Sequence, residues 1–232
     1  MFSDLSRRHL LLSGCASLLA GCASTASEHS ARGIDPATAS IYAARNDPPH
    51  VIPALELSQV DPAVLRREVS YEGPHKPGTV VINLSQRRLY FIQAEARAIR
   101  FGVGVGREEG LNYRGSATVG RKAIWPSWIP TASMIARIPR YATYAAGMPG
   151  GLGNPLGARA LYLYRDNQDT FFRIHGTNEP DSIGQAVSSG CIRLFNHDIV
   201  YLYDQLAIGT PVIVQYEFTA ASRDANFAET KT

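Results

Sequence analysis

The chain has 232 residues, 45% of them hydrophobic and 19% charged, and a formal net charge of +3. This length suits one domain with appended segments, and the composition is that of an ordinary globular protein. The small net charge, without a run of Lys or Arg, argues against a nucleic acid partner.

Residues 1–22 have the features of an export signal rather than of folded structure. Arg7 and Arg8 supply its positive region, and the apolar stretch at 10–20 is too short to span a bilayer. The Arg pair also resembles a twin-arginine signal, so export by the twin-arginine route and by the general secretory route both stay open.

The end of this segment, LAGC at 19–22, resembles a bacterial lipobox, in which the Cys is lipidated and becomes the first residue. It predicts a lipid on Cys22 and a periplasmic protein anchored to a membrane. Ala23 follows where lipoproteins held at the inner membrane tend to have Asp, which favours the outer membrane. The alternative is a plain secretory signal cleaved near residues 23–26.

Residues 23–77 are predicted to form a tether and an N-terminal adaptor. The first half is rich in Ala, Ser and Thr, which is typical of a flexible tether. Asp61 followed by Pro62 predicts an N-cap and a short helix that continues to Glu68. Gly and Pro residues at 73–78 mark the end of the adaptor.

From Thr79 onward the pattern changes to short β-rich runs. Two short helices are predicted, from Thr131 to Ile138 and from Asn196 to Leu206, with Asn196 as N-cap and Gly209 at the C′ position. Many short strands, few helices and no βαβ alternation predict a mainly β domain, either a sandwich or a partly closed barrel. The strands are predicted at 79–83, 88–92, 98–105, 117–124, 160–164, 170–174 and 211–216.

Two tryptophans, Trp125 and Trp128, lie in an irregular Pro-containing segment. They could pack under a loop or line a substrate groove, and both interpretations stay open because aromatic side chains serve both uses. The Gly- and Pro-rich stretch at 148–157 predicts a mobile loop near the site.

Cys191 is the candidate nucleophile. A mature chain that begins at a lipidated Cys22 would keep only Cys191 as a free thiol, which excludes an intramolecular disulfide and a Cys-rich metal site. The preceding Ser-Ser-Gly at 188–190 and the following Arg193 form a small, polar setting near a cation, which suits a reactive thiolate. His175 lies sixteen positions earlier, and the polar loop between them is long enough to bring both side chains together. The pair predicts a nucleophile and its base.

A zinc site is the alternative use of these side chains. His175, Cys191 and His197 have suitable donor atoms, but their spacing matches no known zinc pattern. We expect His197 to be a first-turn helix residue, and we expect no metal and no cofactor.

The stretch from His175-Gly176 to Ser188-Ser189-Gly190-Cys191-Ile192-Arg193 resembles the signature of the L,D-transpeptidases, the YkuD-type catalytic domain. Stretches at 154–157 and 209–214 extend the resemblance, so we assign residues 78–216 to the catalytic domain and 217–232 to a polar tail. The resemblance implies a β-sandwich-like fold with a helix beside the motif. Asp181 departs from the family, in which many members have an aromatic or small polar residue, and this affects loop packing or substrate contact.

The residue types predict a covalent mechanism. Cys191 would attack a peptide carbonyl and form a thioester, while His175 takes the thiol proton and returns one to the leaving amine. The resemblance suggests that the Gly176 carbonyl orients the imidazole. The backbone N–H groups of Ser189, Gly190 and Cys191 are predicted to form an oxyanion hole. Ser188 is predicted to make a hydrogen bond within the turn. Arg193 is predicted either to bind a substrate carboxylate or to brace the loop.

The substrate class follows from the resemblance, which implies peptidoglycan stem peptides with a D-centre. Transfer to an amine would cross-link the wall or attach a protein acceptor, whereas transfer to water would make a carboxypeptidase. The sequence does not separate these outcomes. A non-catalytic wall-binding lipoprotein is the alternative from another class, and it requires an inert Cys191.

Overall fold

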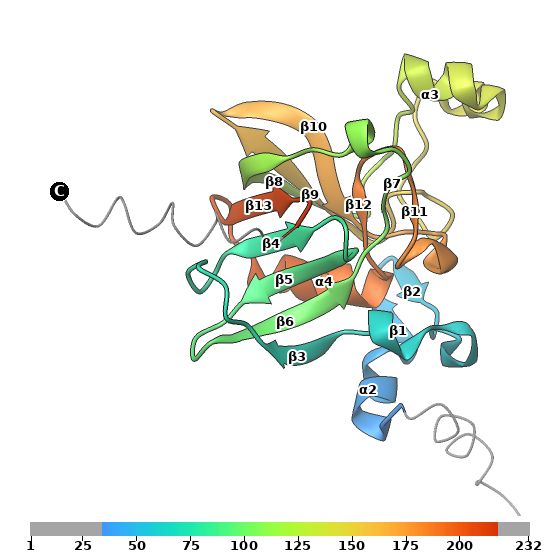
Figure 1. Ribbon diagram of the computed structural model, residues 1–232. Helices are drawn as coiled ribbons and strands as arrows, with labels where there is room; N and C mark the ends of the chain where they lie inside the picture. Colours follow the sequence, from blue (N-terminus) through green and yellow to red (C-terminus); the bar gives the residue numbers. More distant parts are fainter. Residues whose placement is uncertain (1–33, 218–232) are drawn as a thin grey trace, which may run out of the picture.

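A computed structural model describes residues 34–217 (Figure 1). The predicted export signal with Cys22, the first part of the predicted tether and the tail from residue 218 lie outside the described residues. The described strands are β1 (Arg45–Asp47), β2 (His50–Ile52), β3 (Arg67–Ser70), β4 (Val80–Asn83), β5 (Arg88–Ile92), β6 (Arg97–Gly102), β7 (Val105–Gly106), β8 (Gly115–Ile124), β9 (Arg159–Arg165), β10 (Gln168–His175), β11 (Ala186–Ser188), β12 (Ile192–Arg193) and β13 (Pro211–Gln215).

The helices between these strands are short. They are α2 (Pro36–Ile41), α3 (Ala132–Arg137) and α4 (Asn196–Gln205), with 3-10 turns η1 (Leu57–Gln59), η2 (Pro62–Val64), η3 (Glu109–Leu111), η4 (Pro139–Tyr144) and η5 (Pro180–Ser182). Within residues 34–217, no helix has the length and hydropathy needed to cross a membrane.

One mixed sheet of nine strands dominates the described part, in the order β12-β10-β9-β8-β13-β4-β5-β6-β3. β10 pairs in parallel with β12, and β13 pairs in parallel with β4, whereas the other neighbours are antiparallel. Two small sheets, β1-β2 and β11-β7, lie beside it. The predicted mainly β fold is therefore confirmed, with nine of the described strands joined into one continuous sheet.

β4 and β5, which correspond to the predicted strands at 79–83 and 88–92, form an antiparallel hairpin. All four residues of β4 are buried, and in β5 the alternate residues Leu89 and Phe91 point into the core. In the turn, the side-chain oxygen of Asn83 accepts a hydrogen bond from the Gln86 N–H at 2.9 Å. Arg87 has a φ of 53°, the left-handed conformation that a tight turn requires.

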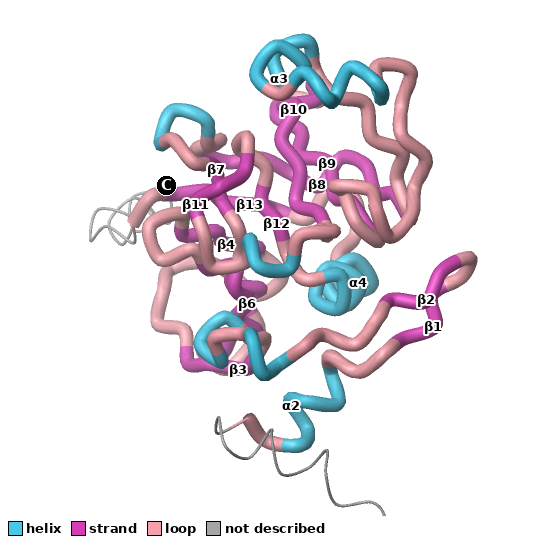
Figure 2. Tube along the Cα trace, turned by 90° about the vertical axis from the view of Figure 1, so that its right-hand side faces the viewer, coloured by secondary structure: helices cyan, strands magenta, loops and turns pink. Residues whose placement is uncertain are grey.

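Helix α4 covers one face of the sheet (Figures 1 and 2). Leu161 of β9 and Ile174 of β10 share one hydrophobic cluster with Ile199 and Leu202 of α4, and all four are 0% exposed. Full burial of each such side chain is worth about 1.5 to 3 kcal/mol. The helix and its cluster thus support the end of β10 from behind.

The described part of the predicted adaptor is tied to the sheet by buried polar contacts. Both oxygens of Asp47 accept hydrogen bonds from the Arg159 guanidinium at 2.7 Å, and the two side chains are 9% and 8% exposed. Tyr42, which is 1% exposed, donates its hydroxyl proton to the Asp198 carboxylate of α4 at 3.1 to 3.2 Å. β3 joins the edge of the main sheet through β6.

The predicted helix from Pro62 to Glu68 is wrong beyond its first turn. Asp61 accepts a hydrogen bond from the Ala63 N–H at 2.8 Å, as an N-cap does, but η2 ends at Val64. Residues 67–70 instead pair with β6, because the open edge of a sheet offers their backbone groups partners that a longer helix would have to supply internally.

Two further boundaries differ from the prediction. The strand predicted at 98–105 divides, since β6 ends at Gly102 and β7 pairs with β11 instead. The C-cap of α4 is Leu206, so Gly209 is not its C′ residue; Gly209 has a φ of 90° in the turn before β13. The cap of α3 is confirmed, because Thr131 Oγ1 accepts a hydrogen bond from the Met134 N–H at 3.2 Å.

The buried Asp47–Arg159 pair gives a stability prediction. Asp47→Ala should lower the free energy of unfolding by about 3 to 5 kcal/mol, because it leaves a buried guanidinium without its carboxylate. Urea unfolding at neutral pH measures this change. The matched control is Glu68→Ala, which removes an exposed ion pair with Arg97 and should cost about 1 kcal/mol or less. Equal losses in the two variants would contradict a special role for the buried pair.

Candidate active site

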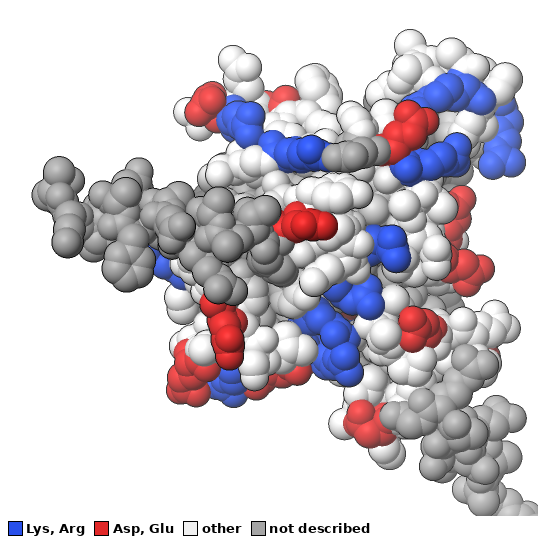
Figure 3. Space-filling view, viewed as in Figure 1, with Lys and Arg blue, Asp and Glu red and all other residues white. Residues whose placement is uncertain are grey.

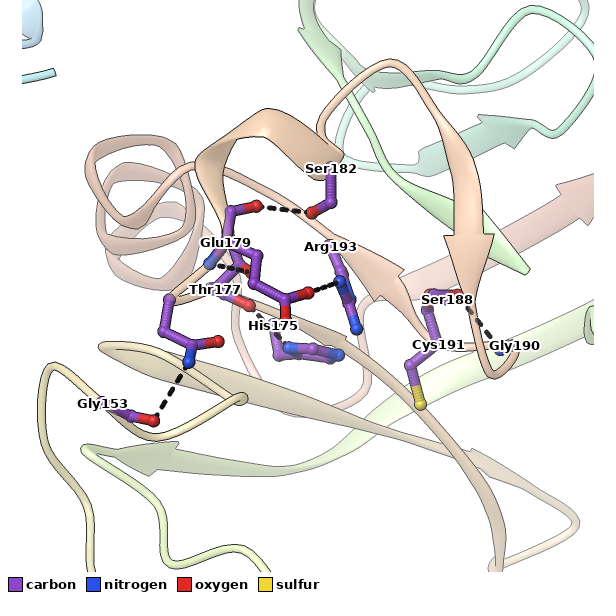
Figure 4. Close-up of polar contacts among 11 residues, drawn as sticks. Gly153, His175, Thr177, Glu179, Ser182, Ser188, Gly190, Cys191 and Arg193 are labelled. Carbon is purple, nitrogen blue, oxygen red and sulfur yellow. Dashed lines mark hydrogen bonds and ion pairs between the residues drawn. The ribbon is translucent and has the colours of Figure 1, made fainter. Parts of the chain in front are cut away.

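The parallel pairing of β10 with β12 brings the predicted site residues together. Its register sets Ile174 opposite Ile192 and His175 opposite Arg193. Ile174 and Ile192 point into the core, at 0% and 4% exposed, so the alternate residues share the other face of the sheet. The side chains that this alternation places on the other face are Arg173, His175, Cys191 and Arg193. Figure 4 shows the last three grouped around the turn before β12.

His175 ends β10 and is 4% exposed. Its Nδ1 lies 2.6 Å from the carbonyl oxygen of Gly176. Because a carbonyl can only accept, Nδ1 carries the proton in the neutral ring and Nε2 is the basic nitrogen. The Gly176 carbonyl thus lies where the resemblance implies a group that orients the imidazole.

Burial lowers the pKa of His175 to about 3, and the neighbouring charges of Arg193 and Arg173 act in the same direction. Burial also raises the pKa of the Cys191 thiol, and the backbone N–H and guanidinium of Arg173, with Arg193, offset this only in part. At neutral pH the structure therefore favours a neutral thiol beside a neutral imidazole. A thiolate–imidazolium pair is not the resting state that this environment stabilises.

The turn that carries Cys191 is fixed by Ser188. Its hydroxyl donates to the Cys191 carbonyl at 2.7 Å and accepts from the Gly190 N–H at 3.0 Å (Figure 4). Gly190 has a φ of 124°, and a Cβ there would collide with the Leu111 carbonyl, so the turn requires glycine. The Gly190 N–H is occupied by Ser188, so of the predicted oxyanion donors it is Ser189 and Cys191 that this arrangement leaves as candidates.

Arg193 braces the loop that follows His175. It pairs with Glu179 at 2.6 Å (Figure 4), and its side chain is 18% exposed. Glu179 is fixed in turn, because its N–H donates to Thr177 Oγ1 at 2.9 Å and its carbonyl accepts from Ser182 Oγ at 2.6 Å. Of the two predicted roles for Arg193, this geometry matches the loop brace. The sequence analysis missed Glu179, whose only signal was an acid close to the motif.

Arg173 is a second residue that the sequence analysis missed. Its guanidinium makes two hydrogen bonds to Asp169, at 2.6 and 2.8 Å, and lies 4.3 Å from the ring centroid of Tyr162. The side chain is 14% exposed and therefore holds a fixed cation beside Cys191. The period-2 alternation of a strand that ends at His175 was the signal that could have placed it on the site face.

Two asparagines hold the surrounding loops. Asn196 was predicted to cap α4, but the N-cap is Phe195. Asn196 instead accepts hydrogen bonds from the N–H groups of Ala158 and Thr177, at 3.0 and 3.2 Å, and donates to the Thr177 carbonyl at 2.9 Å. Asn154, 1% exposed, donates to three carbonyl groups of the loop and its neighbour, Pro126, Met148 and Pro149. The stretch at 148–157, expected to be mobile, is thus held in one conformation by hydrogen bonds from Asn154.

Both tryptophans proposed for a substrate groove are buried. Trp125 is 8% exposed, belongs to a cluster with Val200, and donates its indole N–H to the Asp47 carbonyl at 3.2 Å. Trp128 is also 8% exposed and packs edge-on against Tyr141 with ring centroids 5.0 Å apart. The packing interpretation is the one that the structure supports, because a groove wall would expose the rings.

His197 faces away from the predicted dyad. Its Nε2 lies 2.9 Å from the Ala43 carbonyl in the N-terminal segment. In the described part of the chain, no three His, Cys, Asp or Glu side chains are grouped so that they could hold a metal ion. The zinc alternative therefore has no geometric support.

Comparison with known proteins identifies the family. The family model of the YkuD L,D-transpeptidase catalytic domain matches residues 77–214. The probable L,D-transpeptidase ErfK/SrfK of Salmonella typhimurium is 38% identical over 138 residues, which cover 57% of this chain and 42% of that protein. A putative L,D-transpeptidase of Fuscovulum blasticum is 34% identical over 173 residues, which cover 70% of this chain and 86% of that protein.

A solved structure gives a further match. A crystal structure described as a probable carnitine operon oxidoreductase from Brucella melitensis is 45% identical, covers 67% of this chain and 96% of that chain, and has a TM-score of 0.46. The chain spans about two fifths of the Salmonella relative but most of the Fuscovulum one. With a family model that covers more than half of its length and a relative matched over most of its own, the chain belongs to the L,D-transpeptidase family and contains the YkuD catalytic domain.

Proposed function

We propose that this protein is an L,D-transpeptidase that acts on peptidoglycan stem peptides through a thioester on Cys191. The observation that carries the proposal is the placement of His175 and Cys191 on one face of the β10–β12 pair, with Nδ1 of His175 bound to the Gly176 carbonyl. A nucleophile, its base and a group that orients the base are the parts that covalent acyl transfer needs.

Catalysis begins with a neutral thiol. As the sulfur of Cys191 bonds to the carbonyl carbon of the donor peptide, its proton passes to Nε2 of His175. The C–N bond then breaks, and the same proton passes to the leaving amine. An acceptor amine attacks the thioester, gives its proton to His175, and the thiol re-forms as the new amide is released.

The two arginines act together, on the proton transfer and on the developing negative charge. Arg173 and Arg193 both lower the pKa of His175 and also lower that of Cys191. An imidazolium between two guanidiniums is a strong acid, so it readily delivers its proton to the leaving amine. The same positive field stabilises negative charge on sulfur and on the carbonyl oxygen in the transition state.

The acceptor determines which reaction the thioester completes. Cross-linking of the wall requires a stem-peptide amine, attachment of a protein requires a protein amine, and a carboxypeptidase uses water. We favour cross-linking, because the Salmonella and Fuscovulum relatives are named as transpeptidases. Incubation with tetrapeptide-bearing muropeptides, followed by mass analysis, distinguishes dimers from trimmed monomers.

Cys191→Ala should leave the fold intact and abolish acyl transfer. The side chain lies on the sheet face outside the main cluster, so its loss removes the nucleophile without opening the core. The measurement is muropeptide turnover together with the mass of the acyl-enzyme, and circular dichroism is the folding control. Turnover at the parent rate in this variant would show that the nucleophile is another group.

The pH dependence follows from the resting charges. Because burial raises the pKa of Cys191, its alkylation rate by iodoacetamide should increase as the pH rises through and above neutrality, without a plateau below it. His175→Ala should leave this profile nearly unchanged, since the imidazole is neutral, yet slow acylation at least about a hundredfold. The control is His75→Ala, which removes a histidine that is hydrogen-bonded to Tyr71 and should change neither rate. A plateau below neutral pH that His175→Ala abolishes would establish a thiolate–imidazolium pair instead.

We also propose that the protein is exported and held at the outer membrane by a lipid on Cys22. The support is the LAGC sequence at 19–22 with Ala23 after it. Two or more acyl chains give stable anchoring. Cys22→Ser should therefore move the protein from the membrane fraction to the soluble fraction, and Cys15→Ser, the matched control, should not. Unmodified parent protein that begins downstream of residue 22 would refute the anchor.

A further inference from the structure

Three arginines form a row across the outer face of β3, β6 and β5, outside the active site. This arginine row consists of Arg67, Arg88 and Arg100. The register sets Arg67 of β3 opposite Arg100 of β6, and Arg100 opposite Tyr90 of β5. Arg88 lies two residues before Tyr90 on the same face, since Leu89 between them points into the core. Figure 3 shows Lys and Arg side chains gathered near the centre of this face of the molecule.

These arginines are not paired with acidic side chains in the part of the chain that the structure describes. The ion pairs found among residues 34–217 include neither Arg67 nor Arg88 nor Arg100. Like charges placed directly opposite one another across a strand pair are destabilising. The net charge of the whole chain is only +3, so a generally basic surface does not explain the row.

Two members of the row, Arg88 and Arg100, are partly withdrawn from water. Burial lowers the pKa of Arg100, and the charges of Arg67 and Arg88 lower it further. Burial likewise lowers the pKa of Arg88, although Tyr90 and Asp61 act in the opposite direction. One terminal nitrogen of Arg100 donates to the Ala63 carbonyl at 2.9 Å, whereas its Nε is buried and has no hydrogen-bond partner. Half-buried, mutually repelling guanidiniums with an unused donor are stabilised by an anion that binds between them.

A polar cavity of about 450 Å³ adjoins the row at Arg88. Its wall includes residues 180, 181 and 183–185, which belong to the loop that connects His175 to Cys191. The lining places two carboxylates, Asp61 and Asp181, near Arg87 and Arg88. A cavity with both signs of charge suits a ligand that has both carboxylate and ammonium groups, and it disfavours a doubly charged phosphate.

We propose that the arginine row and this cavity form a second binding site, which holds carboxylate-bearing stem peptides of polymeric peptidoglycan while Cys191 acts on a neighbouring one. The proposal rests on the proposed function, because that function supplies a polymer with many such peptides. Carboxylates along the polymer pair with the guanidiniums of Arg67, Arg88 and Arg100, and stem-peptide amines reach the acidic side of the cavity. Binding at two points holds the enzyme on its substrate by raising the local concentration of further stem peptides.

The test separates polymer binding from turnover. Binding to purified sacculi is measured by co-sedimentation of full-length protein with Cys191→Ala, so that no thioester retains it. The first triple variant adds Arg67→Gln, Arg88→Gln and Arg100→Gln to this protein. It should bind sacculi at least about tenfold more weakly at low salt. The control adds Arg97→Gln, Arg140→Gln and Arg165→Gln, which removes the same charge elsewhere and should change binding by less than about twofold. Equal loss in both triple variants, or no loss in the first, would overturn the site.

Two further measurements distinguish the second site from the catalytic site and from a purely structural role of the arginines. With Cys191 intact, the first triple variant should turn over small soluble muropeptides at the parent rate, so a failure of the second site is distinct from a failure of the proposed function. Its melting temperature should equal or exceed that of the parent, because like-charge repulsion is removed. A lower melting temperature would indicate a structural role and would contradict the proposal.

A membrane contact is tested with phosphatidylglycerol vesicles. If the first triple variant lost binding to these vesicles but kept binding to sacculi, the row would belong to a membrane contact and the proposal would fail. Arg67→Gln alone, at an exposed position, repeats the sacculus test if the triple variant does not fold.

Discussion

The parallel hydrogen bonding between β10 and the two-residue strand β12 is the contact on which the site depends. It fixes which residues of two distant segments share a face, since a one-residue slip of β12 against β10 would turn Arg193 into the core and bring Ile192 out. The core enforces the register, because both isoleucines lie in the cluster that α4 covers. Catalytic geometry is in this way a consequence of hydrophobic packing.

Burial and charge together determine the chemistry that this geometry can perform. Burial favours the neutral forms of Cys191 and His175, and the two fixed cations favour negative charge wherever it develops. Arg173 is held by Asp169 and Arg193 by Glu179, so neither guanidinium has to be ordered during the reaction. A field that is already in place costs no reorganisation when the transition state forms.

The surrounding scaffold is fixed by a few buried polar contacts. Asp47 binds Arg159 at the start of β9, and Tyr42 binds Asp198 of α4, so the N-terminal segment is packed against the catalytic domain. Asn196 joins the loop at 157–158 to the one that follows His175. Such contacts join residues that are far apart in the sequence, and neither propensity nor periodicity indicates them.

The sequence by itself determined the mainly β class, most of the strands of the main sheet, and Cys191 and His175 as the candidate pair. These depend on local pattern and on residue chemistry, which a linear chain displays. Only the tertiary structure decided that Trp125 and Trp128 are packing residues and that residues 67–70 form an edge strand. It also decided that the dyad is neutral at rest, because pKa values depend on desolvation and on charges brought close by folding. Local preferences are properties of the chain, whereas burial and long-range pairing exist only once the chain has folded.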